Sequence, residues 1–263
     1  MANARTAHDP ATGGMGRTTI DPGEVAKFSA MAAEWWDPFG PFKPLHKFNP
    51  VRLGLIRDEA CAHFGRDRFE RRPLEGLSLL DIGCGGGLVA EPMARLGARV
   101  TAIDASERNV KTAMAHAREA KLDIDYRATT AEALAEDGAR PFDVVLALEV
   151  AEHVADVDLF VDAAARLLAP GGLMGVATIN KTIKSLLTAK IGAEYVLRWL
   201  PRGTHDWNKF LPPARVADAL EDAGLSVTRR AGLQYLPVLD GWRVGDDLDV
   251  NYMVFAAKAK AAG

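Results

Sequence analysis

From residue 77 onward, short apolar runs alternate with segments whose apolar residues recur every three or four positions. The short runs predict strands, and the periodic segments between them predict amphipathic helices. Strands separated by helices favour a doubly wound α/β fold with a mostly parallel sheet, and the last two strands predict an antiparallel edge. The seven predicted strands cover residues 77–82, 99–104, 124–127, 142–150, 173–179, 226–236 and 250–257.

The amino-terminal region lacks this alternation. Residues 1–20 are small or polar with no apolar period, so they predict a disordered tail. Order is expected to begin at Asp21, which can cap a helix that has Pro22 in its first position and Glu24 to return the capping bond. We expect this helix to include Trp35 and to stop at the next proline.

Prolines at 38, 41, 44 and 50 predict an irregular, extended segment, with a second helix capped by Asn49 and Pro50. We therefore expect a helical cap over residues 21–75 and one domain over residues 21–263. Residues 180–210 interrupt the strand and helix pattern and are expected to form an inserted amphipathic segment.

Composition limits the classes of function. The 263 residues carry a net charge of −3, which gives no general attraction to nucleic acid. The two cysteines, Cys61 and Cys84, fit a reduced, cytoplasmic protein. No leader-like segment and no run of about 18 apolar residues occurs, so we expect neither secretion nor a membrane span.

A glycine-rich turn, LLDIGCGGG at residues 79–87, follows the first predicted strand. Glycines such as Gly83 and Gly85 let the backbone approach a nucleotide closely at the carboxyl end of the sheet. Asp104 ends the next strand, where its carboxylate can accept both hydroxyl groups of a ribose. These residues predict a site for an adenosine-containing ligand.

Two ligands compete for this site, because residues 85–90 also satisfy the looser Gly-x-Gly-x-x-Ala pattern of NAD-binding proteins. Asp81 lies two residues before the first glycine, near the centre of the expected ligand. Its carboxylate would repel a pyrophosphate but would attract a cationic sulfonium and ammonium. The sequence therefore favours S-adenosylmethionine, and an NAD-dependent oxidoreductase is the second hypothesis.

A second polar cluster follows the fourth main strand. Glu149, Glu152 and His153 lie at a predicted strand-to-helix junction, where the three side chains can converge. They could bind a divalent cation, Mg²⁺ or a similar ion, that lowers the pKa of a bound phenol. Without a metal, His153 could act as the general base. A third interpretation is purely structural, with carboxylates that cap the next helix and a packed histidine.

The pattern Asp81-x-Gly83-x-Gly85-x-Gly87, together with Asp104, resembles the signature of class I methyltransferases, which have a Rossmann-like fold. Longer motifs are similar to those of the ubiquinone-biosynthesis O-methyltransferases. They are AEWWDP at 33–38, PLHKFNPVRL at 44–53, residues 192–206 with the following Lys209 and Phe210, and DVNYM at 249–253.

This resemblance implies methyl transfer from S-adenosylmethionine to ring hydroxyls of 2-polyprenyl-6-hydroxyphenol and 3-demethylubiquinol. It implies cofactor contacts at Arg52, Gly83, Asp104 and Leu148, to which our own interpretation adds Asp81 and Gly85. It also implies that Glu149, Glu152 and His153 bind the metal. The chain departs from the family at Ala151, where Ile or Leu is usual, and at Leu148, where Met is common. Both departures are apolar and concern only the shape of the pocket.

Large apolar and basic residues are mixed over residues 181–202. Such a segment can lie on an anionic membrane with its apolar side chains in the lipid. A lid over the active site or an ordinary core helix are the alternatives. The expected membrane contacts are Leu186, Leu187, Trp199 and Leu200.

We therefore expect a cytoplasmic enzyme on the inner face of the membrane, with a polyprenylated phenol or quinol as substrate. Other ubiquinone-biosynthesis enzymes are candidate partners, and nucleic acid is not. Two further hypotheses stay open, a methyltransferase for another phenolic or lipid substrate and a non-catalytic membrane-associated protein that retains the nucleotide crevice.

Overall fold

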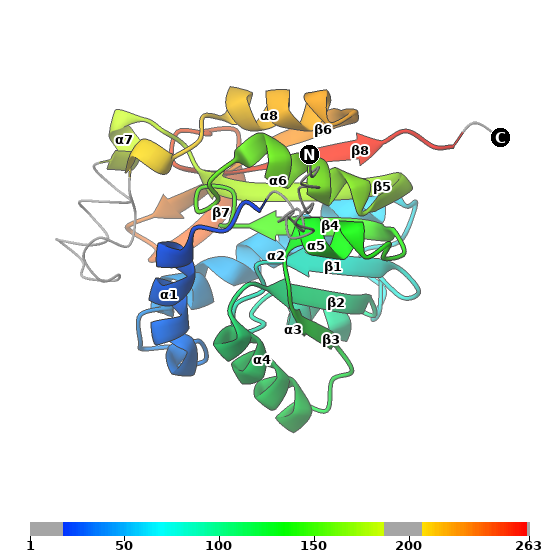
Figure 1. The fold of residues 1–263 in the computed structure, drawn as a ribbon. Coiled ribbons are helices and arrows are strands. Elements are labelled where there is room, and N and C mark those ends of the chain that lie inside the picture. The colour runs from blue at the N-terminus through cyan, green and yellow to red at the C-terminus, as the bar shows by residue number, and fades with distance from the viewer. Residues whose placement is uncertain (1–17, 187–206, 262–263) are drawn as a thin grey trace, which may run out of the picture.

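The computed structural model describes residues 18–186 and 207–261. Within these residues, one eight-stranded sheet has the order β3-β2-β1-β4-β5-β8-β6-β7, with helices on both faces (Figure 1). The strands are β1 Ser78–Ile82, β2 Arg99–Asp104, β3 Asp125–Ala128, β4 Phe142–Leu148, β5 Leu168–Ile179, β6 Leu225–Leu236, β7 Gly241–Gly245 and β8 Asn251–Lys258.

The first five strands pair in parallel, with β1 between β2 and β4, β2 next to β3, and β4 next to β5. β8 runs antiparallel between β5 and β6, and β7 pairs antiparallel with β6. The strand order reverses between β1 and β4, and such a reversal opens a crevice at the carboxyl ends of the strands. The doubly wound sheet with an antiparallel edge is confirmed, and the segments that follow β1, β2 and β4 meet at one edge.

Helices from the two halves of the chain cover opposite faces of the sheet. α2, α3 and α4 contribute to one apolar cluster, and α5, α6 and α8 contribute to the other. Side chains of Ser106, Thr130 and Asp156 cap α4, α5 and α6 by accepting a backbone N–H in the first turn. The helices are α1 Pro22–Ala30, α2 Lys43–His63, α3 Ala90–Arg95, α4 Glu107–Glu119, α5 Ala131–Glu136, α6 Val157–Arg166, α7 Ile183–Ser185 and α8 Pro213–Asp222, with short 3-10 turns at Ala32–Glu34 and Trp207–Lys209.

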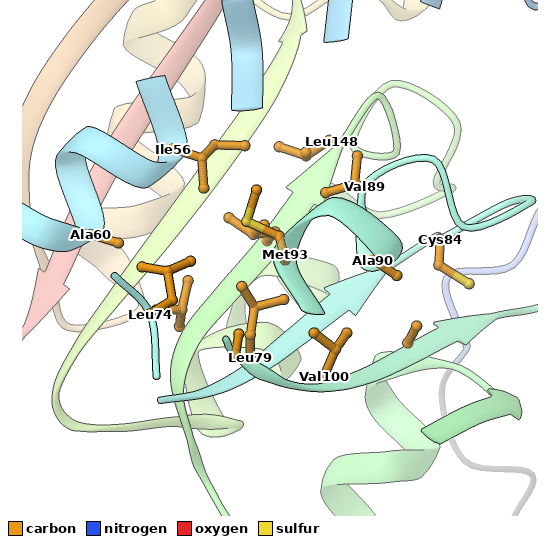
Figure 2. Close-up of a cluster of buried hydrophobic side chains, with 14 of the residues drawn as sticks. Ile56, Ala60, Leu74, Leu79, Cys84, Val89, Ala90, Met93, Val100 and Leu148 are labelled. Carbon is orange, nitrogen blue, oxygen red and sulfur yellow. The ribbon is translucent and has the colours of Figure 1, made fainter. Parts of the chain in front are cut away.

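The packing of α2 on the sheet positions one of the predicted site residues. Figure 2 shows Ile56 of α2 beside Met93 of α3, above Leu79 of β1 and Val100 of β2, and all four side chains are buried. Full burial of each large apolar side chain contributes about 1.5–3 kcal/mol. Arg52 precedes Ile56 by one helical turn and therefore lies on the same buried face of α2.

The eighth strand, β7, was not predicted, because the sequence indicated seven. Its five residues begin and end with glycine, and its side chains are exposed or half-buried. Only three residues, Trp242 to Val244, lie between its two glycines, which are turn signals, and a strand pattern needs a run of at least about four residues. β7 forms through its ladder with β6, from Gly232 opposite Gly245 to Leu236 opposite Gly241.

The cap of α1 is confirmed, since the Asp21 side chain accepts hydrogen bonds from the backbone N–H groups of Gly23 and Glu24. The expected length of α1 was wrong. The helix ends at Ala30, and a 3-10 turn precedes Trp35. This change of direction brings Trp35 to the glycine turn instead of leaving it on the face of α1.

Two other expectations for this region were wrong. Thr19, assigned to the tail, is buried, its carbonyl accepts a hydrogen bond from Ala155, and its hydroxyl donates to Glu132. α2 begins at Lys43 and continues through Pro50. Pro44 lies in the first turn, where no intrahelical N–H bond is needed, and Pro50 removes a single bond in a helix that tertiary packing stabilises.

The inserted segment is described only at its two ends. Leu187, Trp199 and Leu200 lie outside the described residues, and Leu186, just after α7, is half-buried. Among the described helices, none has the length and apolar character needed to cross a membrane.

Candidate active site

A cavity of about 1010 Å³ opens at the carboxyl edge of the sheet. The turn after β1, the ends of β2 and β4, α1, the first half of α2 and the β6–β7 hairpin all contribute to its lining. The cavity brings together every predicted cofactor and catalytic residue, namely Arg52, Asp81, Gly83, Gly85, Asp104, Leu148, Glu149, Glu152 and His153.

The glycine turn requires glycine at two positions for both backbone and packing reasons. Gly83 has φ +72° and Gly85 has φ +53°, in the left-handed region that favours glycine. A Cβ atom at Gly83 would lie 2.3 Å from the side chain of Val150, and one at Gly85 would lie 2.5 Å from the ring of Trp35. The turn is therefore packed tightly between the segment after β4 and the amino-terminal region.

Asp104 is held at the end of β2 by local hydrogen bonds. Its Oδ2 accepts from the backbone N–H of Gly85 at 2.9 Å, and its Oδ1 accepts from the backbone N–H of Ser106 at 2.8 Å. Asn109 also donates to Oδ1 at 3.3 Å and accepts from Trp35 Nε1 at 3.0 Å. The carboxylate thus faces the cavity in a fixed orientation, as a ribose ligand requires, although burial raises its pKa.

Asp81 and Arg52 are buried charges of opposite sign in the lining. Burial raises the pKa of Asp81 to about 7, although the positive charge of Arg52 opposes this rise. The Oδ2 atom of Asp81 has no hydrogen-bond partner in the described structure. Arg52 Nη1 lies 3.4 Å from Glu149 Oε1, Nη2 donates to Asn49, and Nε has no partner in the described residues. Unpartnered buried atoms of both signs fit a zwitterionic ligand that brings an ammonium and a carboxylate.

Glu149 and Glu152 form a buried carboxyl pair after β4. Glu149 has φ +57°, a rare conformation for a residue with a side chain, and its backbone N–H donates to Ala177 at 2.9 Å. Glu152 Oε2 accepts from the hydroxyl of Thr178 at 2.7 Å. Burial, together with the nearby charge of Glu149, raises the pKa of Glu152 well above its ordinary value. Such strain and crowding of like charges are typical of functional sites.

His153 faces a different partner. Its Nδ1 lies 3.1 Å from Glu24 Oε2, and Phe28 packs edge-on against its ring. Lys209 Nζ donates to Glu24 Oε1 at 3.2 Å and to Asp21 Oδ2 at 3.0 Å. Although burial opposes it, the charges of His153 and Lys209 lower the pKa of Glu24. An ionised Glu24 accepts a hydrogen bond from Nδ1–H, so Nε2 of the neutral ring is left as an acceptor.

The three predicted metal ligands do not fit a metal ion as they are arranged. Across residues 18–186 and 207–261, no group of three His, Cys, Asp or Glu side chains could hold an ion together. Glu149 is paired with Arg52, Glu152 accepts from a hydroxyl group, and His153 is bonded to the carboxylate of Glu24. The divalent cation therefore stays a prediction.

Several residues of the site were missed because their role depends on distant contacts. Glu24 appeared in the sequence only as a capping residue, and Trp242 lies on the strand that was not predicted. Trp36 Nε1 donates to the carbonyl of Gly86 at 2.8 Å, and its ring stacks on His116 at a centroid distance of 3.5 Å. Trp35 had been expected in the first helix, and the Trp35-Trp36 pair otherwise appeared only in a family motif, which was the one signal for its contact with the glycine turn.

The fold and the site define a class I methyltransferase. Residues 55–230 match the family described as "Methyltransferase domain". The magnesium protoporphyrin IX methyltransferase of Synechocystis PCC 6803, solved with bound S-adenosylmethionine, has a TM-score of 0.61 at 16% identity, over 90% of this chain and 97% of that one. A SAM-dependent methyltransferase from Aquifex aeolicus has a TM-score of 0.52 at 18% identity, over 83% of this chain and 98% of that one. These likenesses show the fold.

Similarity to curated proteins identifies the family within this class. Ubiquinone biosynthesis O-methyltransferase from Chelativorans sp. (strain BNC1) is 60% identical over 93% of this chain and 96% of its own length. The corresponding protein of Parvibaculum lavamentivorans is 57% identical over 93% of this chain and 96% of its own length. That of Caulobacter vibrioides is 58% identical over 91% of this chain and 95% of its own length. The chain belongs to the ubiquinone biosynthesis O-methyltransferase family.

Proposed function

We propose that this protein transfers the methyl group of S-adenosylmethionine to ring hydroxyls of 2-polyprenyl-6-hydroxyphenol and 3-demethylubiquinol in ubiquinone biosynthesis. The observation that carries this proposal is that one cavity joins two chemically different halves. Asp81, Gly85 and Asp104 line a polar half that fits an amino acid joined to a nucleoside. An apolar half extends from it toward the β6–β7 hairpin.

The apolar half suits a prenylated ring. Phe48 of α2 packs against Trp242 of β7 with ring centroids 4.6 Å apart, and Leu233 and Tyr235 of β6 also line the cavity. Ligand sites of this kind combine mostly apolar walls with a few placed polar groups. The polar groups at the junction of the halves are Glu149 and His153.

S-adenosylmethionine supplies an electrophilic methyl group on a sulfonium. The chain contributes binding and proton transfer. Asp104 is placed to accept the ribose hydroxyls, Asp81 to face the cationic end and Arg52 the carboxylate of the cofactor. His153, oriented by Glu24, is placed to accept the proton of the ring hydroxyl at Nε2. Phe28 and Trp35 line the same cavity and exclude water from it.

Besides S-adenosylmethionine, the sequence predicts a divalent cation at Glu149, Glu152 and His153. The chemistry of two carboxyls and an imidazole supports it, whereas their present partners do not, and we derive no step through it. We expect excess EDTA to abolish turnover and to leave S-adenosylhomocysteine binding intact if the ion is required. Full activity in EDTA would reject the ion and leave the His153 mechanism.

We also propose that the protein works at the inner, cytoplasmic face of an anionic membrane, because its polyprenylated substrate resides in the bilayer. Segment 181–202, with Leu186, Leu187, Trp199 and Leu200, is the proposed contact on the basis of its sequence. Changing these four residues to Ser should reduce pelleting with anionic vesicles. Equal pelleting of both proteins would reject the contact.

Calorimetric titration with S-adenosylhomocysteine and with NAD tests the assignment of the cofactor, and a methyl-transfer assay with a short-chain prenylated catechol tests the reaction. We expect S-adenosylhomocysteine to bind, NAD not to bind, and the catechol to be methylated on oxygen. Binding of NAD alone would favour the oxidoreductase. Binding of S-adenosylhomocysteine with methylation only of unprenylated phenols would favour another phenolic substrate.

A further inference from the structure

The tip of the β6–β7 hairpin, Pro237 to Asp240, exposes apolar side chains at the apolar end of the cavity. Val238 is 97% exposed and Leu239 is 74% exposed. The residues just before them, Leu236 and Pro237, line the cavity. Isolated surface leucines need no explanation, but adjacent exposed apolar residues beside a ligand cavity indicate an interaction site.

The exposure of the tip does not result from a loosely held loop. Leu239 donates a backbone hydrogen bond to Leu236 at 3.1 Å, and the Asp240 carboxylate accepts from the Tyr235 hydroxyl at 2.7 Å. Lys47 of α2 forms an ion pair with the same carboxylate. These bonds tie the acidic residue of the tip to the body of the protein, while the two apolar side chains are presented to the outside.

The position of the tip in the fold follows from strand direction. β6 runs antiparallel to β8 and β8 antiparallel to β5, so the carboxyl end of β6 lies at the same edge of the sheet as the glycine turn. Figure 1 shows the hairpin on the side of the molecule that carries α1 and α7, away from the carboxyl terminus. The tip therefore stands at the edge where the cavity opens.

Another exposed apolar side chain lies in the segment just before α2, which also lines the cavity. Phe39 is 85% exposed and lies two residues before Pro41, which lines the cavity. Basic residues accompany these apolar positions, with Lys43 at the start of α2 and Arg243 on β7. Apolar tips with basic neighbours are complementary to the acyl chains and anionic headgroups of a bilayer.

We propose that Val238 and Leu239 of the hairpin tip, together with Phe39, insert into the bilayer and form the opening through which the prenyl chain of the substrate passes between membrane and cavity. This inference rests on the proposed function, because only a membrane-borne substrate needs such an opening. It concerns described residues and is independent of segment 181–202. The exposed surface at this opening is then a lipid contact, and the apolar half of the cavity lies behind it.

The test compares the double variant Val238→Ser/Leu239→Ser with a control variant, Phe69→Ser/Met114→Ser. Phe69 is 80% exposed in the connection that enters β1, at the opposite edge of the sheet, and Met114 is 43% exposed on α4. Co-sedimentation uses vesicles of phosphatidylcholine alone and of phosphatidylcholine mixed with phosphatidylglycerol. We expect the hairpin variant to partition about tenfold more weakly to both, since it loses apolar insertion and no charge. The control should match the unaltered protein.

Titration with S-adenosylhomocysteine shows whether each variant is folded and binds cofactor. A second measurement changes one residue at a time and attaches an environment-sensitive fluorophore to Leu239→Cys or, as the control, to Phe69→Cys. Vesicles should shift emission to the blue at position 239 and not at position 69. Equal partitioning of both double variants, with no shift at position 239, overturns the inference and leaves the proposed function in place. An unaltered protein that binds neither vesicle overturns both the membrane proposal and this inference, while cofactor binding would still support the methyltransferase.

Discussion

The two halves of the polar site are built in different ways. The cofactor half comes from neighbouring strands, and Asp104 accepts three hydrogen bonds from residues close to the turn. The acceptor half, around Glu149, Glu152 and His153, is held by distant segments. Arg52 of α2 connects the two halves, because it faces the cofactor side and also pairs with Glu149, and Glu24 of α1 lies against His153. Arg52 Nε and Glu152 Oε1 are left without partners in the described structure. Short-range hydrogen bonds thus fix Asp104, which faces the cofactor. Charges from distant segments, buried together, hold Glu149 and His153, which face the methyl acceptor.

The largest effect is expected from Arg52→Met, which removes the cation that pairs with Glu149 in the acceptor half. Its loss leaves the buried carboxyls of Asp81, Glu149 and Glu152 without their cation, and breaking a buried charge network costs about 3–5 kcal/mol. Denaturant unfolding should show this loss of stability. Arg57→Met on the same helix, where Arg57 forms a half-exposed pair with Asp58, should cost less than about 1 kcal/mol. Equal losses would mean that the acceptor half is not strained.

Asp104→Ala tests the cofactor half. Loss of two charge-assisted hydrogen bonds to the ribose, each worth roughly 1.5–3 kcal/mol, should weaken S-adenosylhomocysteine binding by at least about tenfold. The exposed Asp125 of the next strand gives a matched control, since Asp125→Ala should leave binding unchanged. Unchanged affinity of Asp104→Ala in calorimetry would show that this acid does not hold the ribose.

Asp81→Asn should show opposite effects on stability and on binding. The native pKa of about 7 lies above the ordinary value of 3.8, so the unfolded chain releases its proton first as pH rises. Asp81 therefore lowers stability progressively between about pH 4 and pH 7, and Asn should recover up to about 4 kcal/mol at pH 8 and nothing below pH 4. The same variant should bind S-adenosylmethionine more weakly at pH 8, because the cation loses its carboxylate. A variant that is no more stable than the unaltered protein at pH 8 would show that burial does not raise the pKa of Asp81.

Glu24→Ala should have the smallest effect, about tenfold on kcat, because it removes the orientation of His153 and not the base itself. KM for S-adenosylmethionine should stay constant, and Glu24→Gln should recover part of the rate because its amide oxygen can accept a hydrogen bond from Nδ1–H. Glu107→Ala on α4, which removes an exposed acid paired with Lys111, serves as the control. If Glu24→Gln is as slow as Glu24→Ala, orientation by a hydrogen bond does not explain the role of Glu24.

The sequence by itself determined the parts whose physical cause is local. Strand and helix periods indicated every strand except β7, and the capping pattern at Asp21 indicated the start of α1. The glycine turn and Asp104 could be assigned because a strand end, a tight turn and the next strand end form one short, contiguous unit. The strand-to-helix junction after β4 indicated Glu149, Glu152 and His153 in the same way. The resemblance to a family added Arg52 and Leu148, which no local rule assigns to a ligand.

The tertiary structure decided what depends on contacts between distant segments. β7 forms because β6 offers it a ladder, and α2 tolerates Pro50 because its buried face packs on the sheet. Burial of Asp81 between Arg52 and the glycine turn, rather than its position in the chain, raises its pKa. Glu24 and His153 are 129 positions apart in the sequence. Only the fold brings the acid of the first turn of α1 into contact with the histidine. Hydrogen-bond geometry and desolvation are properties of the assembled site, so the sequence could name these groups but not their partners.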